Sequence, residues 1–212
     1  MHSYIAIEGP IGVGKTTLAR SLQNTLGAQV VFDTNDNPFL DDFYKDRPSA
    51  AFRTQMYFLI SRFEQQLAMG SLPPAGAPRV CDYLFAKDKI FAYLNLDDHE
   101  ILIYDRYFAA LSLQVPKPDL VVYLNAPKQV LIERVHRRNV DYESKIAEAY
   151  VAELIKAYDH FFYHYKDAPL LIVDTSEIDF VESPHELRAL LQCITGGAIR
   201  GIQYYHPVRK KK

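Results

Sequence analysis

A glycine-rich turn between a strand and a helix is the feature that most constrains how this chain folds. The run EGPIGVGKTT, residues 8–17, follows YIAIE (4–8), an apolar segment that has the character of a buried strand. It precedes LARSLQNTLG (18–27), in which apolar residues recur at helical spacing and a glycine closes the segment. Three glycines and a proline within seven residues, followed at once by a lysine and two threonines, need a chemical reason.

The turn matches the pattern G-x-x-x-x-G-K-[ST] of a phosphate-binding loop. Glycines permit backbone angles that point N–H groups inward at phosphate oxygens, and the following helix directs its positive end at the same anion. The lysine supplies a full charge to the β and γ phosphates of ATP, and the first threonine hydroxyl can ligate Mg²⁺. The residues predicted to bind the nucleotide are Gly9, Gly12, Gly14, Lys15, Thr16 and Thr17.

Composition sets the remaining outer limits. The chain has 212 residues, enough for one compact domain, and its net charge of −2 gives no reason to expect bulk attraction to nucleic acid or anionic lipid. No apolar run approaches the ~20 residues of a membrane span, and the N-terminus leads directly into a strand rather than a signal peptide. Cys81 and Cys193 lie far apart, outside metal-ligand spacing, which indicates free thiols. We expect one cytoplasmic domain over residues 1–212.

Short apolar runs alternate with longer segments of helical period. Continuous apolar runs indicate strands buried on both faces, and their alternation with helices indicates a parallel sheet covered on both sides. We predict an α/β fold, the three-layer P-loop NTPase type, with a central parallel sheet of about five strands flanked by helices. The expected strands are 4–8, 28–32, 79–82, 119–124 and 170–174. The expected helices are 54–68, with Met56, Leu59, Phe63 and Leu67 on its apolar stripe, 127–138 and 145–165, and the expected loops are 71–78 and 195–201.

The loop alone does not say what happens to the triphosphate. A GTPase usually carries a D-x-x-G switch and an N-K-x-D guanine reader. In this chain no aspartate is followed three residues later by glycine, and N-K-x-D is absent. A small-molecule kinase is favoured, and its chemistry needs a carboxylate near the attacking hydroxyl and arginines over the transferred phosphoryl group.

Three further stretches bear on the phosphoryl acceptor: DNPFLDDFY (36–44), AFRTQMYFLISRFEQQ (51–66) and CDYLFAKDKIFA (81–92). With the phosphate loop and PDLVVYL (118–124), they resemble the deoxynucleoside kinase family, especially its short bacterial deoxyadenosine/deoxyguanosine kinase-like members. The resemblance covers nearly the whole chain. It implies a homodimeric enzyme of nucleotide salvage that uses ATP and Mg²⁺ to phosphorylate the 5′-hydroxyl of a deoxynucleoside, with purines favoured.

The resemblance also implies catalytic roles. An acidic residue after the second strand is the general base in the family, usually a glutamate; here it is Asp33, whose alternative is turn or helix-cap chemistry. Asp82, at the end of the third strand, joins Thr16 in the Mg²⁺ shell. The arginine that usually follows this acid is replaced by Tyr83.

A lid of about residues 134–143 is the next implied feature. Arg134 and Arg138 are one helical turn apart and can neutralise charge on the γ-phosphoryl oxygens. The last lid arginine of the family is Val140 here, and Arg137 is its candidate substitute. Glu143 matches a glutamate that binds the sugar 3′-hydroxyl.

The implied acceptor site has four further residues. Tyr44 matches a tyrosine that contacts the sugar 3′-hydroxyl. Arg53 stands after Phe52, where we place the base-reading glutamine of the family, and an arginine offers only donors to a base. Arg62 and Asp88 either pair with each other or together hold a base edge.

Two rival hypotheses stay open at this point. Asp105-Arg106-Tyr107 resembles the DRY that nucleoside monophosphate kinases of the thymidylate kinase type carry after a strand. Residues 101–104 in a sheet would favour that class. We expect instead a helix over 99–113. The other rival is a nucleotide-binding regulator without catalysis, which the departures at positions 53, 83 and 140 suggest.

Overall fold

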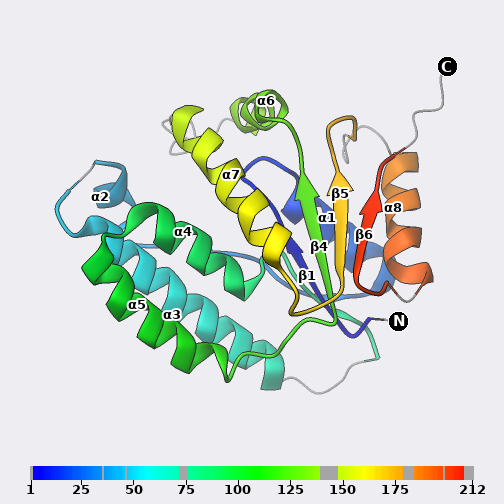
Figure 1. Cartoon of the computed structure of the whole chain (residues 1–212). Coiled ribbons are helices and arrows are strands. Elements are labelled where there is room, and N and C mark those ends of the chain that lie inside the picture. Colours follow the sequence, from blue (N-terminus) through cyan, green and yellow to red (C-terminus); the bar gives the residue numbers. More distant parts are fainter. Residues whose placement is uncertain are drawn as a thin grey trace.

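A parallel sheet of six strands is the centre of the molecule (Figure 1). The strands are β1 (Tyr4–Glu8), β2 (Gln29–Val31), β3 (Arg79–Cys81), β4 (Leu120–Asn125), β5 (Leu170–Asp174) and β6 (Ile202–Tyr205). They lie in the order β2-β3-β1-β4-β5-β6, and every neighbouring pair is parallel. This computed structural model describes residues 2–34, 36–45, 47–71, 76–138, 148–178, 184–197 and 199–207.

Helices cover both faces of the sheet. They are α1 (Lys15–Leu26), α2 (Leu40–Tyr44), α3 (Ala50–Ser71), α4 (Asp88–Asn95), α5 (Asp98–Ser112), α6 (Lys128–Arg138), α7 (Glu148–His164) and α8 (Pro184–Gly196), with a short 3₁₀ turn, η1 (Phe85–Lys87). Helices α1 and α8 pack on one face and α7 on the other, while α3, α4 and α5 form a group beside the sheet (Figure 1). No helix in the described part of the chain is long and apolar enough to span a membrane.

Alternation along β1 explains why the sheet needs helices on both sides. Ile5 and Ile7 are buried in the cluster formed with α1 and α8, whereas Ala6 between them packs with the α7 cluster. Successive side chains of a strand point to opposite faces, so both faces of this strand are apolar. The prediction of a buried parallel sheet from continuous apolar runs is therefore confirmed.

The sixth strand is the main departure from the predicted fold. β6 pairs with β5 at the sheet edge, just after the segment 195–201 that the sequence indicated as a loop. Ile202 and Tyr204 are largely exposed, so β6 lacks the continuous buried run that identified the other strands. Residues 101–104 belong to α5, which begins after a capping box at Asp97, and the expectation of the thymidylate kinase hypothesis is wrong.

Helix α3 buries a polar face beside the apolar stripe predicted for it. Leu59 is fully buried with Met56 and Phe63 packed against the same cluster, whereas Leu67 is 37% exposed. The polar residues that α3 also buries are Thr54, Gln55, Arg62 and Gln66. Buried polar side chains need partners. Helix α3 therefore carries hydrogen-bonding groups to the carboxyl end of the sheet, where the functional site lies.

The glycine-rich loop is held too closely for side chains at two positions. A Cβ on Gly9, where φ is +151°, would lie 2.2 Å from the backbone oxygen of Leu124 in β4. A Cβ on Gly12 would lie 2.9 Å from the backbone oxygen of Leu131 in α6. The loop thus needs glycine for its contacts with neighbouring backbone as well as for its backbone angles.

We predict that Gly9→Ala lowers the free energy of unfolding by about 4 kcal/mol, because backbone strain and a steric clash add. The matched control is Gly27→Ala at the end of α1, where φ is also positive but the added Cβ meets open space. That variant should lose only about 1 kcal/mol from the left-handed backbone. Denaturant unfolding measures both, and equal losses would contradict the close approach.

Candidate functional site

The loop at the carboxyl end of β1 presents a backbone suited to an anion. Gly14 caps α1 in the left-handed conformation, and among the described residues no side-chain cap bonds to the start of the helix. The first N–H groups and the positive end of the helix are therefore open to phosphate. Lys15 Nζ donates to the backbone oxygens of Gly9 (2.7 Å) and Pro10 (3.2 Å), and burial lowers its pKa. Thr17 lies in the first turn of α1.

Glu8 holds this loop in place through hydrogen bonds of its carboxylate. Its side chain is fully buried at the end of β1, and its Oε1 accepts from the Gly9 amide (2.8 Å) and the Tyr158 hydroxyl (3.0 Å). Its Oε2 accepts from the Leu84 amide (2.8 Å). One carboxylate thus connects the phosphate loop to α7 and to the segment after β3.

Thr16 and Asp82 form a pair of oxygen donors beside the loop. Thr16 Oγ1 donates to Asp82 Oδ2 (2.9 Å), and burial raises the pKa of Asp82. Mg²⁺ prefers oxygen ligands and usually binds through one or two carboxylates plus substrate phosphates, so this donor set fits that ion. No group of three or more His, Cys, Asp or Glu side chains in the described ranges could hold a metal by itself.

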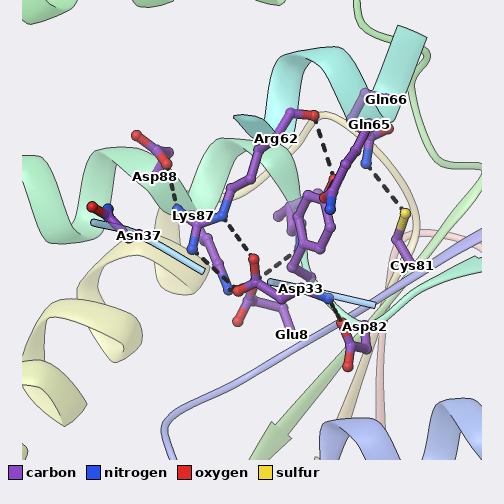
Figure 2. Close-up of polar contacts among 12 residues, drawn as sticks. Glu8, Asp33, Asn37, Arg62, Gln65, Gln66, Cys81, Asp82, Lys87 and Asp88 are labelled. Atoms are coloured by element: carbon purple, nitrogen blue, oxygen red, sulfur yellow. Dashed lines mark hydrogen bonds and ion pairs between the residues drawn. The ribbon is translucent and has the colours of Figure 1, made fainter. Parts of the chain in front are cut away.

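Asp33, directly after β2, is held by two cations (Figure 2). Arg62 of α3 donates from Nε (3.0 Å) and Nη2 (3.1 Å) to its two oxygens, and Lys87 Nζ lies 2.5 Å from Oδ2. Burial alone would raise the pKa of Asp33, but the charges of Arg62 and Lys87 outweigh it and hold that pKa well below the ordinary range. The Asp33 amide donates to Asp82 Oδ1, which joins this carboxylate to the Thr16–Asp82 pair.

Asp88 is a second carboxylate on the same arginine. Arg62 Nη1 lies 2.5 Å from its Oδ2, so the predicted pairing of Arg62 with Asp88 is confirmed. Gln55 Nε2 (2.6 Å) and the Tyr104 hydroxyl (2.9 Å) both donate to its Oδ1. Burial raises the pKa of Tyr104, which keeps that hydroxyl a donor. Because the Gln55 nitrogen is used, its Oε1 is the atom that it can offer to a ligand.

A cavity of about 220 Å³ connects these groups. The phosphate loop and the charged side chains of Asp33, Arg62, Asp82 and Lys87 line its polar part. Its other end is largely apolar. The lining residues used below are Gly12, Lys15, Thr16, Asp33, Tyr44, Gln55, Phe58, Arg62, Asp82, Lys87 and Phe91. A cavity with a phosphate loop at one end and aromatic rings with a buried amide at the other matches a molecule that has a charged tail and a planar ring.

Arg53 does not reach this cavity, which corrects our prediction that it reads a base. Its guanidinium lies over the Phe39 ring, 5.2 Å from the centroid, and 3.7 Å from Asp42 near the surface. Gln55 lines the cavity instead. The two residues are two positions apart on α3, so they point to opposite sides of the helix. Tyr44, by contrast, lines the cavity, and its contact with a sugar hydroxyl stays a prediction.

The lid residues are only partly described. Arg134 on α6 donates to Thr175 Oγ1 (3.1 Å) and to the backbone oxygens of Thr175 and Ile178 (both 2.7 Å), so it binds the segment after β5. The side chain of Arg138 and the whole of Glu143 lie outside the described residues.

Sequence reasoning missed three residues of the site: Glu8, Gln55 and Lys87. Gln55 had a usable signal, because it lies seven positions before Arg62 and hence on the same face of a helix. Glu8 had a weaker one, a carboxylate that ends a buried strand. Lys87 stands in a 3₁₀ turn with no periodicity, and its contact with Asp33 joins segments 54 residues apart.

The fold and the site together define a P-loop protein of the kinase type. The model of the family described as "Deoxynucleoside kinase" matches residues 5–196. The chain is 34% identical to a deoxyguanosine kinase of Bacillus subtilis (strain 168) over 184 residues, 84% of this chain and 89% of that protein. It is 35% identical to a deoxyadenosine kinase of Dictyostelium discoideum over 197 residues, 90% of this chain and 78% of that protein.

A solved structure of a deoxynucleoside kinase is also similar to this chain. It is a deoxyadenosine kinase from M. mycoides with the products dCMP and a flexible dCDP bound. It superposes with a TM-score of 0.79 at 25% identity, covering 91% of this chain and 99% of that one. The chain therefore belongs to the deoxynucleoside kinase family, and the resemblance found from the sequence is confirmed. It is a phosphotransferase that acts on deoxynucleosides.

We predict that Arg62→Met lowers the free energy of unfolding by about 3–5 kcal/mol at neutral pH, because it leaves two buried carboxylates short of a cation. Burial raises the pKa of Asp33 in the folded state, but the charge of Arg62, with that of Lys87, lowers it below the unfolded value. The resulting stabilisation is complete above about pH 4 and is lost as the pH falls toward the folded pKa. The difference in free energy of unfolding between wild type and variant, measured by denaturant unfolding, should therefore decrease as the pH falls from about 5 to 2.

The control for this variant is Arg53→Met, on the same helix but exposed. It should change stability by no more than about 0.5 kcal/mol at any of these pH values. If the difference in free energy of unfolding between wild type and Arg62→Met stays constant or increases in acid, the assigned role of the Arg62–Asp33 pair is contradicted.

Proposed function

We propose that this kinase transfers the γ-phosphoryl group of ATP to the 5′-hydroxyl of a deoxynucleoside, with purines favoured, for nucleotide salvage. The observation that carries the proposal is the cavity that joins Lys15 of the phosphate loop, Asp33 and Gln55. The names of the curated relatives, deoxyguanosine and deoxyadenosine kinase, support the purine preference.

In this proposal the triphosphate lies against the loop amides and Lys15, and the acceptor hydroxyl lies at Asp33. The 5′-oxygen forms a bond to the γ-phosphorus as the bond from that phosphorus to the oxygen of ADP breaks. The hydroxyl proton passes to the Asp33 carboxylate. Because the transition state of phosphoryl transfer is loose, a weak base of low pKa is adequate to accept this proton.

Thr16 and Asp82 would hold Mg²⁺, which would supply positive charge to offset the charge of the transferring phosphoryl group. Their own contribution is to fix two oxygen donors, 2.9 Å apart, next to the loop. Asp82 also accepts from the Asp33 amide, so the same carboxylate orients the proposed metal site and the proposed base.

For the base, we propose that Gln55 offers its Oε1 to an amino group and that Arg62 and Asp88 hold Gln55 in place. Gln55 Nε2 is bound to both the side chain and the backbone oxygen of Asp88 (2.6 and 3.0 Å), which fixes the direction of its Oε1. Phe58 and Phe91 supply apolar cavity walls, and Tyr44 is the candidate contact to the sugar.

The lid remains part of the proposal, within one domain over residues 1–212. We infer that Arg134 and Arg138 neutralise charge on the γ-phosphoryl group and that Glu143 contacts the sugar. Arg134 would have to exchange its bonds to Thr175 and Ile178 for bonds to phosphate oxygens. Guanidinium groups suit such an exchange, because they bind both carbonyl and phosphate oxygens.

We further propose a homodimer and a cytoplasmic location. Exposed apolar side chains on α5, namely Leu102, Ile103 and Tyr107, support association through the long helices. Cys81 and Cys193 are free thiols, which supports a reducing compartment.

The direct test is ADP release by the purified chain with ATP, Mg²⁺ and each of the four deoxynucleosides, the four ribonucleosides and thymidylate. We expect turnover with purine deoxynucleosides. Lys15→Ala should lower kcat by about 100-fold or more, because a charge on the transferring group is lost, with little change in thermal unfolding. Lys156→Ala on the exposed face of α7 is the control.

Turnover of thymidylate alone would favour the rejected nucleotide kinase class, and ATP binding without any acceptor would favour the regulator. Normal rates in Lys15→Ala would contradict the phosphate-loop assignment itself.

A second prediction concerns specificity. Gln55→Met should change the ratio of kcat/KM between deoxyadenosine and deoxyguanosine by about 10-fold or more, because the pocket loses a hydrogen-bonding group. Arg53→Gln is the control, since its guanidinium lies outside the cavity lining. A ratio that follows position 53 rather than position 55 would contradict the placement of the base.

A further inference from the structure

Lys87 is a buried ammonium in the cavity for which the reaction described above has no use. It ends the 3₁₀ turn η1, its side chain is 4% exposed, and it lines the cavity beside Asp33. A lysine is rarely buried without a reason, because its charge loses hydration. Part of the reason is charge balance, since Arg62 is shared between Asp33 and Asp88 and Lys87 supplies the second positive charge.

The ammonium of Lys87 has donor capacity to spare. It has three N–H groups, of which Asp33 Oδ2 accepts one at 2.5 Å. Glu8 Oε2 lies 4.0 Å away, beyond hydrogen-bond range, and its carboxylate is already bound to two amides and a tyrosine hydroxyl. The ammonium also lies 5.5 Å from the centroid of the Tyr83 ring, but no further hydrogen-bond acceptor for it is found among the described residues. The remaining N–H groups can therefore serve a ligand in the cavity.

The other two basic side chains in the described lining already have partners of their own. Lys15 is folded onto the phosphate loop through the oxygens of Gly9 and Pro10. Arg62 uses all three of its nitrogens on two carboxylates. The side chain of residue 83 offers no charge: Tyr83 is fully buried and donates to Gln65 on α3 (2.9 Å), away from the cavity lining.

We propose that Lys87 is a catalytic residue that holds Asp33 in place and donates a second N–H to the 5′-oxygen of the acceptor nucleoside. This inference rests on the proposed function and its transfer step. Lys87 and the acceptor hydroxyl then share one neighbour, Asp33, which accepts from both. As the hydroxyl gives its proton to Asp33, the ammonium stabilises the oxygen that bonds to phosphorus.

The charge around this ammonium favours that role. The ionisable groups that face it or its carboxylate partner come from five segments: Glu8, Lys15, Asp33, Arg62, Asp82 and Asp88. Carboxylates outnumber the cations among these groups, so the positive charge of Lys87 has negative charge around it at the point where the acceptor would meet the phosphate loop.

The test is steady-state kinetics of Lys87→Met and Lys87→Arg. In Lys87→Met we expect kcat to fall by about 100-fold or more, as for loss of a donor that acts in the transition state. The KM for ATP should stay within about threefold, because the phosphate loop is untouched. Lys87→Arg should recover kcat to within about 10-fold of wild type, since it restores a charged donor.

Lys89→Met is the matched control: it lies two residues on, is 39% exposed and pairs with Asp105 at the surface. It should keep kcat within about twofold. Lys87→Met that folds and retains kcat within about threefold, or Lys87→Arg that is as slow as Lys87→Met, overturns the proposal.

A double variant covers the case in which Lys87→Met leaves Asp33 poorly neutralised and fails to fold. Asp33→Asn/Lys87→Met removes both charges together and is compared with Asp33→Asn alone. Because the proposed donation to the 5′-oxygen does not pass through Asp33, the double variant should lose at least a further threefold or so in kcat relative to Asp33→Asn. A smaller loss overturns the proposal, because Lys87 then acts only by holding Asp33.

Failure of the underlying function gives a different result. If wild type releases no ADP with any nucleoside, the proposed function fails. If wild type turns over, Lys15→Ala abolishes turnover and Lys87→Met is normal, only the role of Lys87 fails.

Discussion

The ionic network at the carboxyl end of the sheet is the constraint on which the rest of the structure depends. Its largely buried members are Glu8, Lys15, Asp33, Arg62, Asp82, Lys87 and Asp88. Charges are stable in a protein interior only when they are paired and hydrogen-bonded, and removing one partner is costly. The phosphate loop, α3, η1 and the segments after β2 and β3 must therefore converge on one point, and the convergence forms the polar end of the cavity.

The strand order fixes the spacing between Asp33 and the phosphate loop. Because β3 lies between β2 and β1, Asp82 stands between Asp33 and the phosphate loop. Asp82 accepts from Thr16 on one side and from the Asp33 amide on the other. In the proposed mechanism, the distance from nucleotide phosphate to acceptor hydroxyl would thus be set by the width of one strand in the middle of the sheet. Such a site needs no large rearrangement of the sheet to bring donor and acceptor together.

The sequence identified those parts of the molecule in which local chemistry dictates local structure. The loop over residues 8–17 was predictable because its mechanism specifies the residue at each position, and buried strands were predictable from continuous apolar runs. β6 was missed because an exposed edge strand has no such run. Arg53 was chosen over Gln55 because the resemblance placed the base-reading residue directly after Phe52, and the buried polar contacts that single out Gln55 appear only in the tertiary structure. Lys87 meets Asp33 only through tertiary structure, which no local pattern encodes.

The most direct measurement of the central claim is a crystal structure of the chain with a non-hydrolysable ATP analogue, Mg²⁺ and deoxyguanosine. The account predicts phosphates on the loop amides and the nucleoside 5′-oxygen within about 3.2 Å of an Asp33 oxygen, the distance a proton transfer needs. It also predicts the purine between Phe58 and Phe91 with an edge at Gln55. A nucleoside bound elsewhere, or one whose 5′-oxygen points away from Asp33 toward solvent, would contradict it.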